Sequence, residues 1–441
     1  MNVSIHYQIR GKSSNQIASG IEDAIRDGRI AAGARLPAIR SLASSLRVSP
    51  ATVAAAYHSL RVRGLLRGSG RRGTIVNRRP PLAVPAMPPL PAGVRNLMDG
   101  NPDPALLPPL RDFFKHVDYA PPLYGTAVNR PELLEAARRW FDADGVDSAA
   151  IAVVSGAMDA IERVLEAHLG PGDSVAVEDP CYRGTLDLVS AMGLVAEPVA
   201  IDEFGPIPEA MESALRAGVS ALIVTPRGQN PTGAAMDRKR ASALSAILGR
   251  HRDVLVVEDD FTGPISGAPL FSLSAKRERW AVVRSLSKFL GPDLRVALVA
   301  GDPLTIARVE GRQHLGSRWV SHVLQAAAAA MLSDAGVKKL IGRAAETYAA
   351  RRNAMLDALR KRGVEARGRS GLNIWVPVAE ETGTVQSLLK SGYAVLAGES
   401  FRLRSAPGIR VMIASLDVRE ASRVADAIAA ALRPRGATHV V

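Results

Sequence analysis

The spacing of apolar residues divides the first eighty residues into three helical stretches and a pair of short strand-like pieces. Isoleucines recur at Ile17, Ile21 and Ile25, which predicts one helix with a single buried face. A second helix, which Pro37 can start, is predicted by four apolar residues: Leu36, Ile39, Leu42 and Leu46. Ser49 and Pro50 form a suitable N-cap and first turn for a third helix.

Residues 64–76 follow this third helix as two strand-like pieces around a tip rich in glycine and arginine. Three helices followed by a hairpin are typical of a winged helix-turn-helix. The sequence therefore predicts that fold for residues 1–78.

A different pattern extends from about residue 150 to 300, where short apolar runs alternate with amphipathic stretches. The apolar runs are 151–154, 175–177, 221–224 and 254–257, and the amphipathic stretches include 159–169 and 240–248. This alternation predicts an α/β fold with a large, mostly parallel sheet covered on both faces. Long Ala- and Arg-rich helices follow, residues 335–362 among them, and then a small α/β part over 371–433.

Proline density marks the boundary between these two regions. Six of the twelve residues from Pro80 to Pro91 are proline, which disfavours both helix and sheet and favours an extended spacer. We therefore expect the winged helix-turn-helix module over 1–78, a linker over 79–95 and a larger module over 96–441.

Charge is distributed unequally between the two modules. The chain of 441 residues has a formal net charge of +13, and the first eighty residues contain fourteen Lys and Arg against three Asp and Glu. So strong an asymmetry indicates a nucleic-acid partner for the basic part, with a solvated basic face as the alternative.

Composition excludes several other classes of protein. The single cysteine, Cys181, excludes an internal disulfide framework, and no Cys/His cluster indicates a zinc site, so no metal is expected. The N-terminus lacks the apolar core of a signal peptide, and no apolar run approaches the ~20 residues of a membrane helix. We expect a cytoplasmic protein without a membrane partner.

Lys288 has a sequence context suited to an aldehyde cofactor. Only nine lysines accompany forty-seven arginines, and this one follows an apolar run, 280–283, and the two hydroxyls of Ser285 and Ser287. A neutral lysine amine can form a Schiff base with an aldehyde, which arginine cannot do. The hydroxyls and Arg295, seven residues later, suit a phosphate. An aldehyde cofactor that carries a phosphate is pyridoxal 5′-phosphate (PLP).

Four other segments suit the same cofactor. The Gly156-Ala157-Met158 turn follows a strand and opens a helix, where backbone N–H groups can bind a phosphate. Asp259 lies in an acidic run that ends a strand, where a carboxylate can hold a ring nitrogen protonated, although an N-cap or surface acid is the alternative. Asn230 lies in a turn that could direct an amide at the ring, and Tyr182 could stack on it or be a buried core tyrosine.

One further motif is misleading. Residues 68–73 spell G-x-G-x-x-G, the pattern of a dinucleotide-binding turn, but such a turn needs a strand before it and a helix after it. Here the motif lies in a hairpin that leads into the proline-rich spacer. Arg71 and Arg72 at its tip instead suit insertion into a DNA minor groove.

The basic module resembles the DNA-binding domain of GntR-type repressors, in the segments 36–43, 48–60 and the glycine-rich wing. The resemblance implies that a double-stranded DNA operator is contacted by residues on the helices and the wing: Arg40, Ser49, Thr52, Arg71, Arg72, Gly73 and Thr74. An ordinary exposed helix arginine is the alternative for Arg40.

The larger module resembles the fold-type I aminotransferase domain over about residues 97–433. The resemblance implies Lys288 as the Schiff-base residue, Asp259 at the pyridine nitrogen and Asn230 near the ring oxygen. It implies a phosphate site formed by Ser285, Ser287, Arg295 and the 156–158 turn, with Tyr124 reaching the phosphate of the partner subunit in a homodimer. Arg410 would bind a ligand carboxylate, unless it is a surface arginine.

Together the two modules resemble the MocR subfamily of regulators. Two positions depart from the aminotransferase pattern: Phe261 stands where a tyrosine hydroxyl usually contacts the ring oxygen, and Asn129 stands where glycine is common. The leading hypothesis is a regulator that senses PLP, an amino compound or both. A working aminotransferase with an accessory DNA-binding domain, and a degenerate domain kept for dimerisation, remain alternatives.

Overall fold

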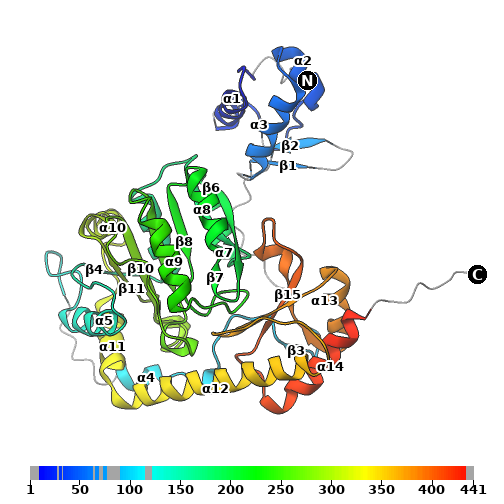
Figure 1. The fold of residues 1–441 in the computed structure, drawn as a ribbon. Helices are drawn as coiled ribbons and strands as arrows, with labels where there is room; N and C mark the ends of the chain where they lie inside the picture. The colour runs from blue at the N-terminus through cyan, green and yellow to red at the C-terminus, as the bar shows by residue number, and fades with distance from the viewer. Residues whose placement is uncertain are drawn as a thin grey trace, which may run out of the picture. The chain divides into compact units, whose positions relative to one another are not determined.

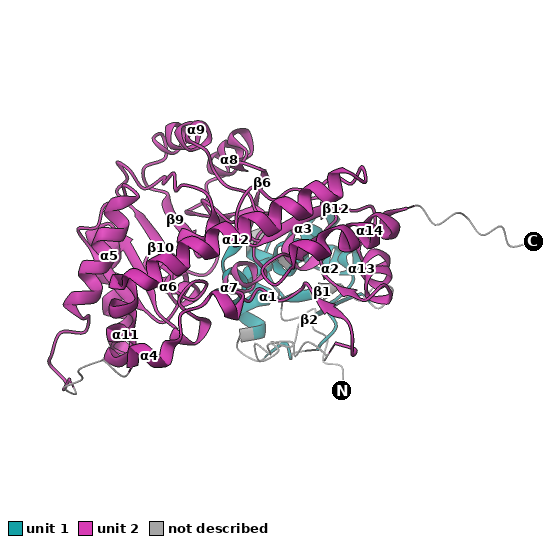
Figure 2. Cartoon of the chain, turned by 90° about the horizontal axis from the view of Figure 1, so that it is seen from below, with its two compact units in different colours: residues 1–89, 189–196 teal, residues 90–188, 197–441 magenta. Residues whose placement is uncertain are grey.

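A computed structural model of the chain describes residues 9–26, 29–31, 33–62, 65–68, 73–76, 90–114 and 122–433. The chain divides into two compact units, residues 1–89 with 189–196 and residues 90–188 with 197–441 (Figure 2). The predicted linker lies mostly outside the described residues. The boundaries at 78/79 and 95/96 therefore stay predictions.

The N-terminal unit contains three helices and a hairpin, as predicted (Figure 1). Its elements are α1 (Ser14–Arg26), α2 (Ile39–Leu46), α3 (Pro50–Val62), β1 (Leu66–Gly68) and β2 (Thr74–Val76). The two strands pair antiparallel, with Leu66 opposite Val76. A small apolar core that includes Ile17, Ile21 and Leu42 holds the helices together.

The helix starts follow local capping. Helix α3 begins at Pro50, and the Ser49 hydroxyl accepts a hydrogen bond from the backbone N–H of Thr52 at 3.1 Å, so the predicted cap is confirmed. Helix α2 begins at Ile39, two residues later than the predicted start at Pro37. Ala38 is in an extended conformation, and the Pro37 carbonyl accepts a hydrogen bond from the buried Tyr57 hydroxyl at 2.8 Å.

The larger unit contains an eight-stranded sheet in the order β4-β11-β10-β9-β8-β5-β6-β7. The strands are β4 (Ile151–Val154), β5 (Ser174–Asp179), β6 (Val195–Asp202), β7 (Gly205–Pro206), β8 (Ala221–Val224), β9 (Leu255–Asp260), β10 (Trp280–Ser285) and β11 (Ala297–Gly301). The central pairs β5·β8, β8·β9 and β9·β10 are parallel, whereas β10·β11, β11·β4 and β6·β7 are antiparallel. The prediction of a mostly parallel sheet is confirmed.

Strand β9 extends three residues beyond the apolar run from which it was predicted. Its last three residues are Glu258, Asp259 and Asp260, and all three are buried. Asp259 pairs in register with Val283 and Asp260 with Arg284 of β10. Because successive side chains alternate between faces, Asp259 and Asp260 point to opposite sides of the sheet.

Helices cover the sheet, as the sequence predicted (Figure 1). The helices between residues 110 and 360 are α4 (Leu110–Phe114), α5 (Pro131–Ala143), α6 (Ala157–Glu166), α7 (Arg183–Ala191), α8 (Pro208–Arg216), α9 (Arg238–Leu248), α10 (Pro303–Leu315), α11 (His322–Ser333) and α12 (Ala335–Arg360). Helix α6 packs on β9, β10 and β11, and it also contacts α10. Because α6 directly follows β4, its first turn lies next to the carboxyl end of β4.

The predicted small C-terminal part is present. It contains β12 (Asn373–Pro377), α13 (Glu381–Lys390), β13 (Tyr393–Ala394), β14 (Leu396–Ala397), β15 (Gly408–Met412) and α14 (Ala421–Leu432). A three-stranded sheet has the order β12-β15-β14. Strand β13 pairs in parallel with β3 (Arg95–Asn96), so the first residues of the larger unit are part of this C-terminal layer.

No helix within the described ranges is both long and apolar enough to cross a membrane.

Candidate functional site

Lys288 lies in the turn that follows β10, with its amine largely enclosed. The amine donates a hydrogen bond to the backbone carbonyl of Gly100 at 2.6 Å. Burial lowers the pKa of Lys288, and the nearby positive charge of Arg410 lowers it further, while Asp259 opposes this. A lowered pKa increases the neutral fraction of the amine, which is the form that attacks an aldehyde.

Asp259 presents an unsatisfied acceptor beside this lysine. Its side chain is buried at 7% exposure, and Oδ1 has no hydrogen-bond partner among the described residues. Burial raises the pKa of Asp259 to about 7, the charge of Asp260 adds to the rise, and Lys288 counteracts it. The burial of Asp259 excludes a surface acid, and its position within β9 excludes an N-cap. An unsatisfied buried acceptor is a suitable partner for a protonated ring nitrogen.

The strand ends and the turn before α6 form a cradle suited to a phosphate. Gly156 is the N-cap of α6 with φ +119°, and a Cβ there would lie 2.4 Å from a guanidinium nitrogen of Arg295. That guanidinium donates to the Ser155 carbonyl at 3.0 Å. Only glycine permits both the backbone conformation and the approach of the arginine. Ala157 and Met158 form the first turn of α6.

The two predicted hydroxyls belong to the same edge of the sheet. The Ser285 and Ser287 hydroxyl oxygens are 2.7 Å apart. Ser285 pairs with Ala297 of β11, and Ala297 pairs with Val154 of β4, the strand that leads into the Gly156 turn. The structure thus brings both serines, Arg295 and the α6 N-terminus to one region.

Arg410 connects the C-terminal layer to this region. It is only 4% exposed, which excludes a surface arginine, and burial lowers its pKa to about 10. One terminal nitrogen donates to Asn230 Oδ1 at 3.1 Å and the other to the Met98 carbonyl. Its Nε is buried without a partner among the described residues. The guanidinium therefore retains hydrogen-bonding capacity for an anionic ligand.

The aromatic residues differ from one another in exposure. Tyr182, just before α7, is 41% exposed, so the alternative of a buried core tyrosine is wrong. Its ring lies against the backbone of Gly184, where a Cβ would approach it to 2.4 Å. Phe261 directly follows β9 and is half-buried. Asn129, which stands where glycine is common in the aminotransferase pattern, donates to a carboxylate oxygen of Glu310 at 3.1 Å.

Within one chain, Tyr124 does not lie with the other predicted site residues. It is 79% exposed and makes an edge contact with Trp319, with ring centroids 5.6 Å apart. The guanidinium of Arg318 lies 5.3 Å from the Tyr124 ring centroid.

The predicted DNA contacts lie on the surface of the N-terminal unit where they are described. Arg40 is exposed on α2, and Ser49 is exposed at the start of α3. Thr52 is half-buried, and its hydroxyl oxygen lies 2.8 Å from that of Ser49. Gly73 is exposed with φ +87°, next to the half-buried Thr74. Arg71 and Arg72 lie outside the described residues.

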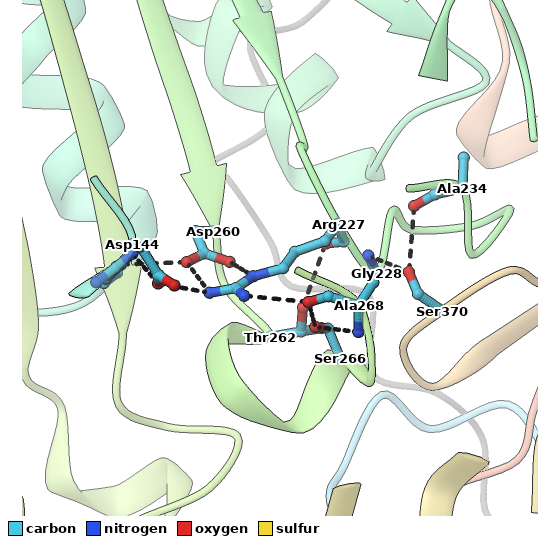
Figure 3. A network of polar contacts seen from close by, with 10 residues as sticks. Asp144, Arg227, Gly228, Ala234, Asp260, Thr262, Ser266, Ala268 and Ser370 are labelled. Carbon is cyan, nitrogen blue, oxygen red and sulfur yellow. Dashed lines mark hydrogen bonds and ion pairs between the residues drawn. The ribbon is translucent and has the colours of Figure 1, made fainter. Parts of the chain in front are cut away.

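Sequence reasoning missed a cluster of buried ion pairs behind the site. Arg227 contacts Asp144 and Asp260 (Figure 3), and Arg284 contacts the same two acids. Since side chains alternate along β9, Asp260 and this cluster lie on the face of the sheet opposite Asp259. The available signal was Arg284 itself, the last residue but one of an otherwise apolar strand, because arginine is rarely fully buried without a paired acid. Its partner acids could not be identified from spacing.

Comparison with known proteins agrees with this architecture. The model of bacterial regulatory proteins of the gntR family matches residues 13–76, and that of aminotransferase class I and II matches residues 122–428. The vitamin B6 salvage pathway transcriptional repressor PtsJ of Salmonella typhimurium is 41% identical over 430 residues, covering 96% of this chain and 99% of PtsJ.

More distant relatives share one or both modules. The pyridoxine biosynthesis transcriptional regulator PdxR of Corynebacterium glutamicum is 28% identical, over 78% of each chain. The solved structure of Pyrococcus horikoshii kynurenine aminotransferase matches with a TM-score of 0.72 and 25% identity, over 77% of this chain and 91% of that one. The chain belongs to the MocR-type regulators, which join a GntR-type DNA-binding domain to a PLP-dependent aminotransferase-class domain.

Proposed function

We propose that this chain is a transcriptional regulator that binds PLP at Lys288 and changes its affinity for an operator in response. The observation that carries the proposal is the juxtaposition of a largely enclosed lysine amine with the unsatisfied carboxylate of Asp259 on the neighbouring strand. The names of PtsJ and PdxR favour genes of vitamin B6 supply as the target.

The described residues suit PLP in charge and in hydrogen-bonding capacity. PLP supplies an aldehyde and an electron-withdrawing ring when it is bound. Lys288 would hold the aldehyde carbon, Asp259 the ring nitrogen and Asn230 the ring oxygen. Tyr182 and Phe261 would flank the ring. The phosphate would lie among Gly156, Ala157, Met158, Ser285, Ser287 and Arg295, where the N–H groups of the α6 N-terminus favour an anion.

An amino compound with a carboxylate would be held by Arg410. The unpartnered Nε of this buried arginine supports the assignment, because a carboxylate can accept two parallel hydrogen bonds from a guanidinium. Phe261 cannot supply the hydroxyl that a tyrosine would direct at the ring oxygen. That loss removes one hydrogen bond, worth ~1 kcal/mol, which favours ligand sensing over rapid turnover.

We further propose a homodimer in which Tyr124 reaches the phosphate of the partner subunit. Its high exposure supports this, together with its contacts to Trp319 and Arg318. The operator would be contacted by Arg40, Ser49, Thr52, Gly73 and Thr74, and by Arg71 and Arg72. The net charge of the first eighty residues supports this assignment.

Covalent trapping tests the cofactor assignment. The purified chain should show a visible absorption band with PLP, and borohydride reduction should remove the band and leave a pyridoxyl label on Lys288 in peptide mass spectra. Lys239→Ala, at an exposed lysine of α9, is the matched control and should label normally. A label on another lysine, or none at saturating PLP, would reject the assignment.

A further inference from the structure

The buried arginine–aspartate quartet (Asp144, Arg227, Asp260 and Arg284) is held by bidentate contacts. Nε and one terminal nitrogen of Arg227 donate to the two carboxylate oxygens of Asp260, each at 2.8 Å. Arg284 Nε donates to Asp260 Oδ2 at 3.2 Å. Asp144, which follows α5, accepts from Arg227 at 3.3 Å (Figure 3). It also accepts from Arg284.

The quartet is almost completely removed from solvent. The side chains of Asp260 and Arg284 are fully buried, that of Arg227 is 5% exposed, and only Asp144 is partly exposed. The Arg284 guanidinium lies 4.4 Å from the Phe141 ring centroid and 4.5 Å from that of Trp140. Buried ion networks are seldom more stabilising than apolar residues of the same volume. Stability alone therefore does not account for four charges in this position.

The sequence positions of the quartet suggest what it does. Asp260 is adjacent to Asp259, and Arg284 is adjacent to Ser285. Arg227 lies three residues before Asn230, in the loop that follows β8. Because side chains alternate along a strand, each strand member of the quartet faces away from the neighbour that we assign to the cofactor. The quartet thus joins the ends of the elements that carry three proposed cofactor contacts.

We propose that the quartet is a positioning unit for the cofactor site. It holds the ends of β9, β10 and the Asn230 loop in one arrangement, and its two positive and two negative charges leave no net charge behind Asp259. This inference rests on the proposed function, in which Asp259 faces the ring nitrogen of PLP.

The charges around Asp259 predict the direction in which each substitution should shift its pKa. Lys288 and Asp260 act on Asp259 directly, and Asp259 in turn interacts with Glu178 of β5. Burial is the main cause of the pKa of about 7 at Asp259, the negative charge of Asp260 raises it, and Lys288 lowers it. Removal of the Asp260 charge should therefore favour ionisation of Asp259. Removal of Arg227, which pairs with Asp260, leaves that negative charge uncompensated and should disfavour ionisation of Asp259.

Pyridoxamine 5′-phosphate is a suitable probe, because it has the ring and phosphate of PLP but no aldehyde to react with Lys288. Its dissociation constant is measured against pH from the quenching of tryptophan fluorescence. For the wild type, affinity should rise with pH as Asp259 ionises and attracts the protonated ring nitrogen. Asp260→Asn should move the midpoint down by about one pH unit, and Arg227→Met should move it up by about as much.

The combined variant separates charge from packing. Arg227→Met with Asp260→Asn removes one charge of each sign, so its midpoint should return close to that of the wild type. The matched control is a pair outside the quartet, Arg240 and Asp202. Arg240 donates two hydrogen bonds to the Asp202 carboxylate, at 2.9 and 2.7 Å. Arg240→Met and Asp202→Asn should leave the midpoint unchanged.

The possible outcomes distinguish this inference from the proposed function. Midpoints that stay fixed, or that move in the same direction for both single variants, would overturn the positioning role. Failure of the wild type to bind the probe at any pH would instead reject the proposed cofactor site. Circular dichroism checks that each variant folds. If one does not, Asp144→Asn takes its place, and the pH midpoint of its probe affinity should shift downward.

Discussion

At the scale of single residues, the site consists of ionisable groups whose burial changes their protonation. Lys288 could be proposed from the sequence, because a lysine after an apolar strand and two serines, in a chain rich in arginine, indicates a reactive amine. The state of Asp259 could not, because its pKa depends on the solvent that the fold removes. The same burial raises the pKa of Glu258 to about 7 and that of Glu178 to about 8.

These raised pKa values predict that the cofactor-free chain loses stability as pH rises. Between pH ~4 and ~7 the folded state keeps a proton on Asp259 that the unfolded state releases, so increasing pH favours unfolding. Asp259→Asn should make the urea midpoint decline less steeply from pH 5 to pH 8. Asp293→Asn, at an exposed acid, is the control. Equal slopes for the wild type and Asp259→Asn would contradict the assigned pKa.

At the scale of elements, strand ends and helix starts position the functional groups. The apolar runs predicted β4 and β8 with their correct bounds, because continuous burial leaves a clear pattern. They missed the last three residues of β9, since acids disfavour a buried strand unless arginines from other elements pair with them, as they do with Asp260. Contacts between distant segments, such as Arg410 with Asn230, leave no local signal at all.

Helix α3 offers a local test at this scale. Ser49→Ala removes the hydroxyl that accepts from the Thr52 N–H, and the lost cap should cost about 1 kcal/mol. Hydrogen exchange should therefore be faster in the peptide that covers residues 50–62. Ser44→Ala, with an exposed side chain on α2, should leave that exchange unchanged. Unchanged protection in Ser49→Ala would show that the cap does not stabilise α3.

At the scale of the whole molecule, two units with different charge carry different tasks. The first eighty residues have most of the net positive charge, so the logarithm of operator affinity should fall linearly with the logarithm of salt concentration. The slope should be about −0.9 for each neutralised phosphate. Arg71→Ala with Arg72→Ala should weaken binding and reduce the slope. Arg250→Ala with Arg252→Ala, two exposed arginines of the larger unit, should change neither.

The central claim is that cofactor binding at Lys288 controls DNA binding, and a PLP titration of operator affinity tests it most directly. Operator DNA is found by genomic footprinting, and its affinity is then measured at increasing PLP for the wild type and Lys288→Ala. A ligand that binds one of two states better shifts the balance between them. We predict that wild-type affinity changes with a half-maximum at the PLP dissociation constant, and that Lys288→Ala responds only weakly. Wild-type operator affinity that is the same without PLP and at saturating PLP would contradict the account.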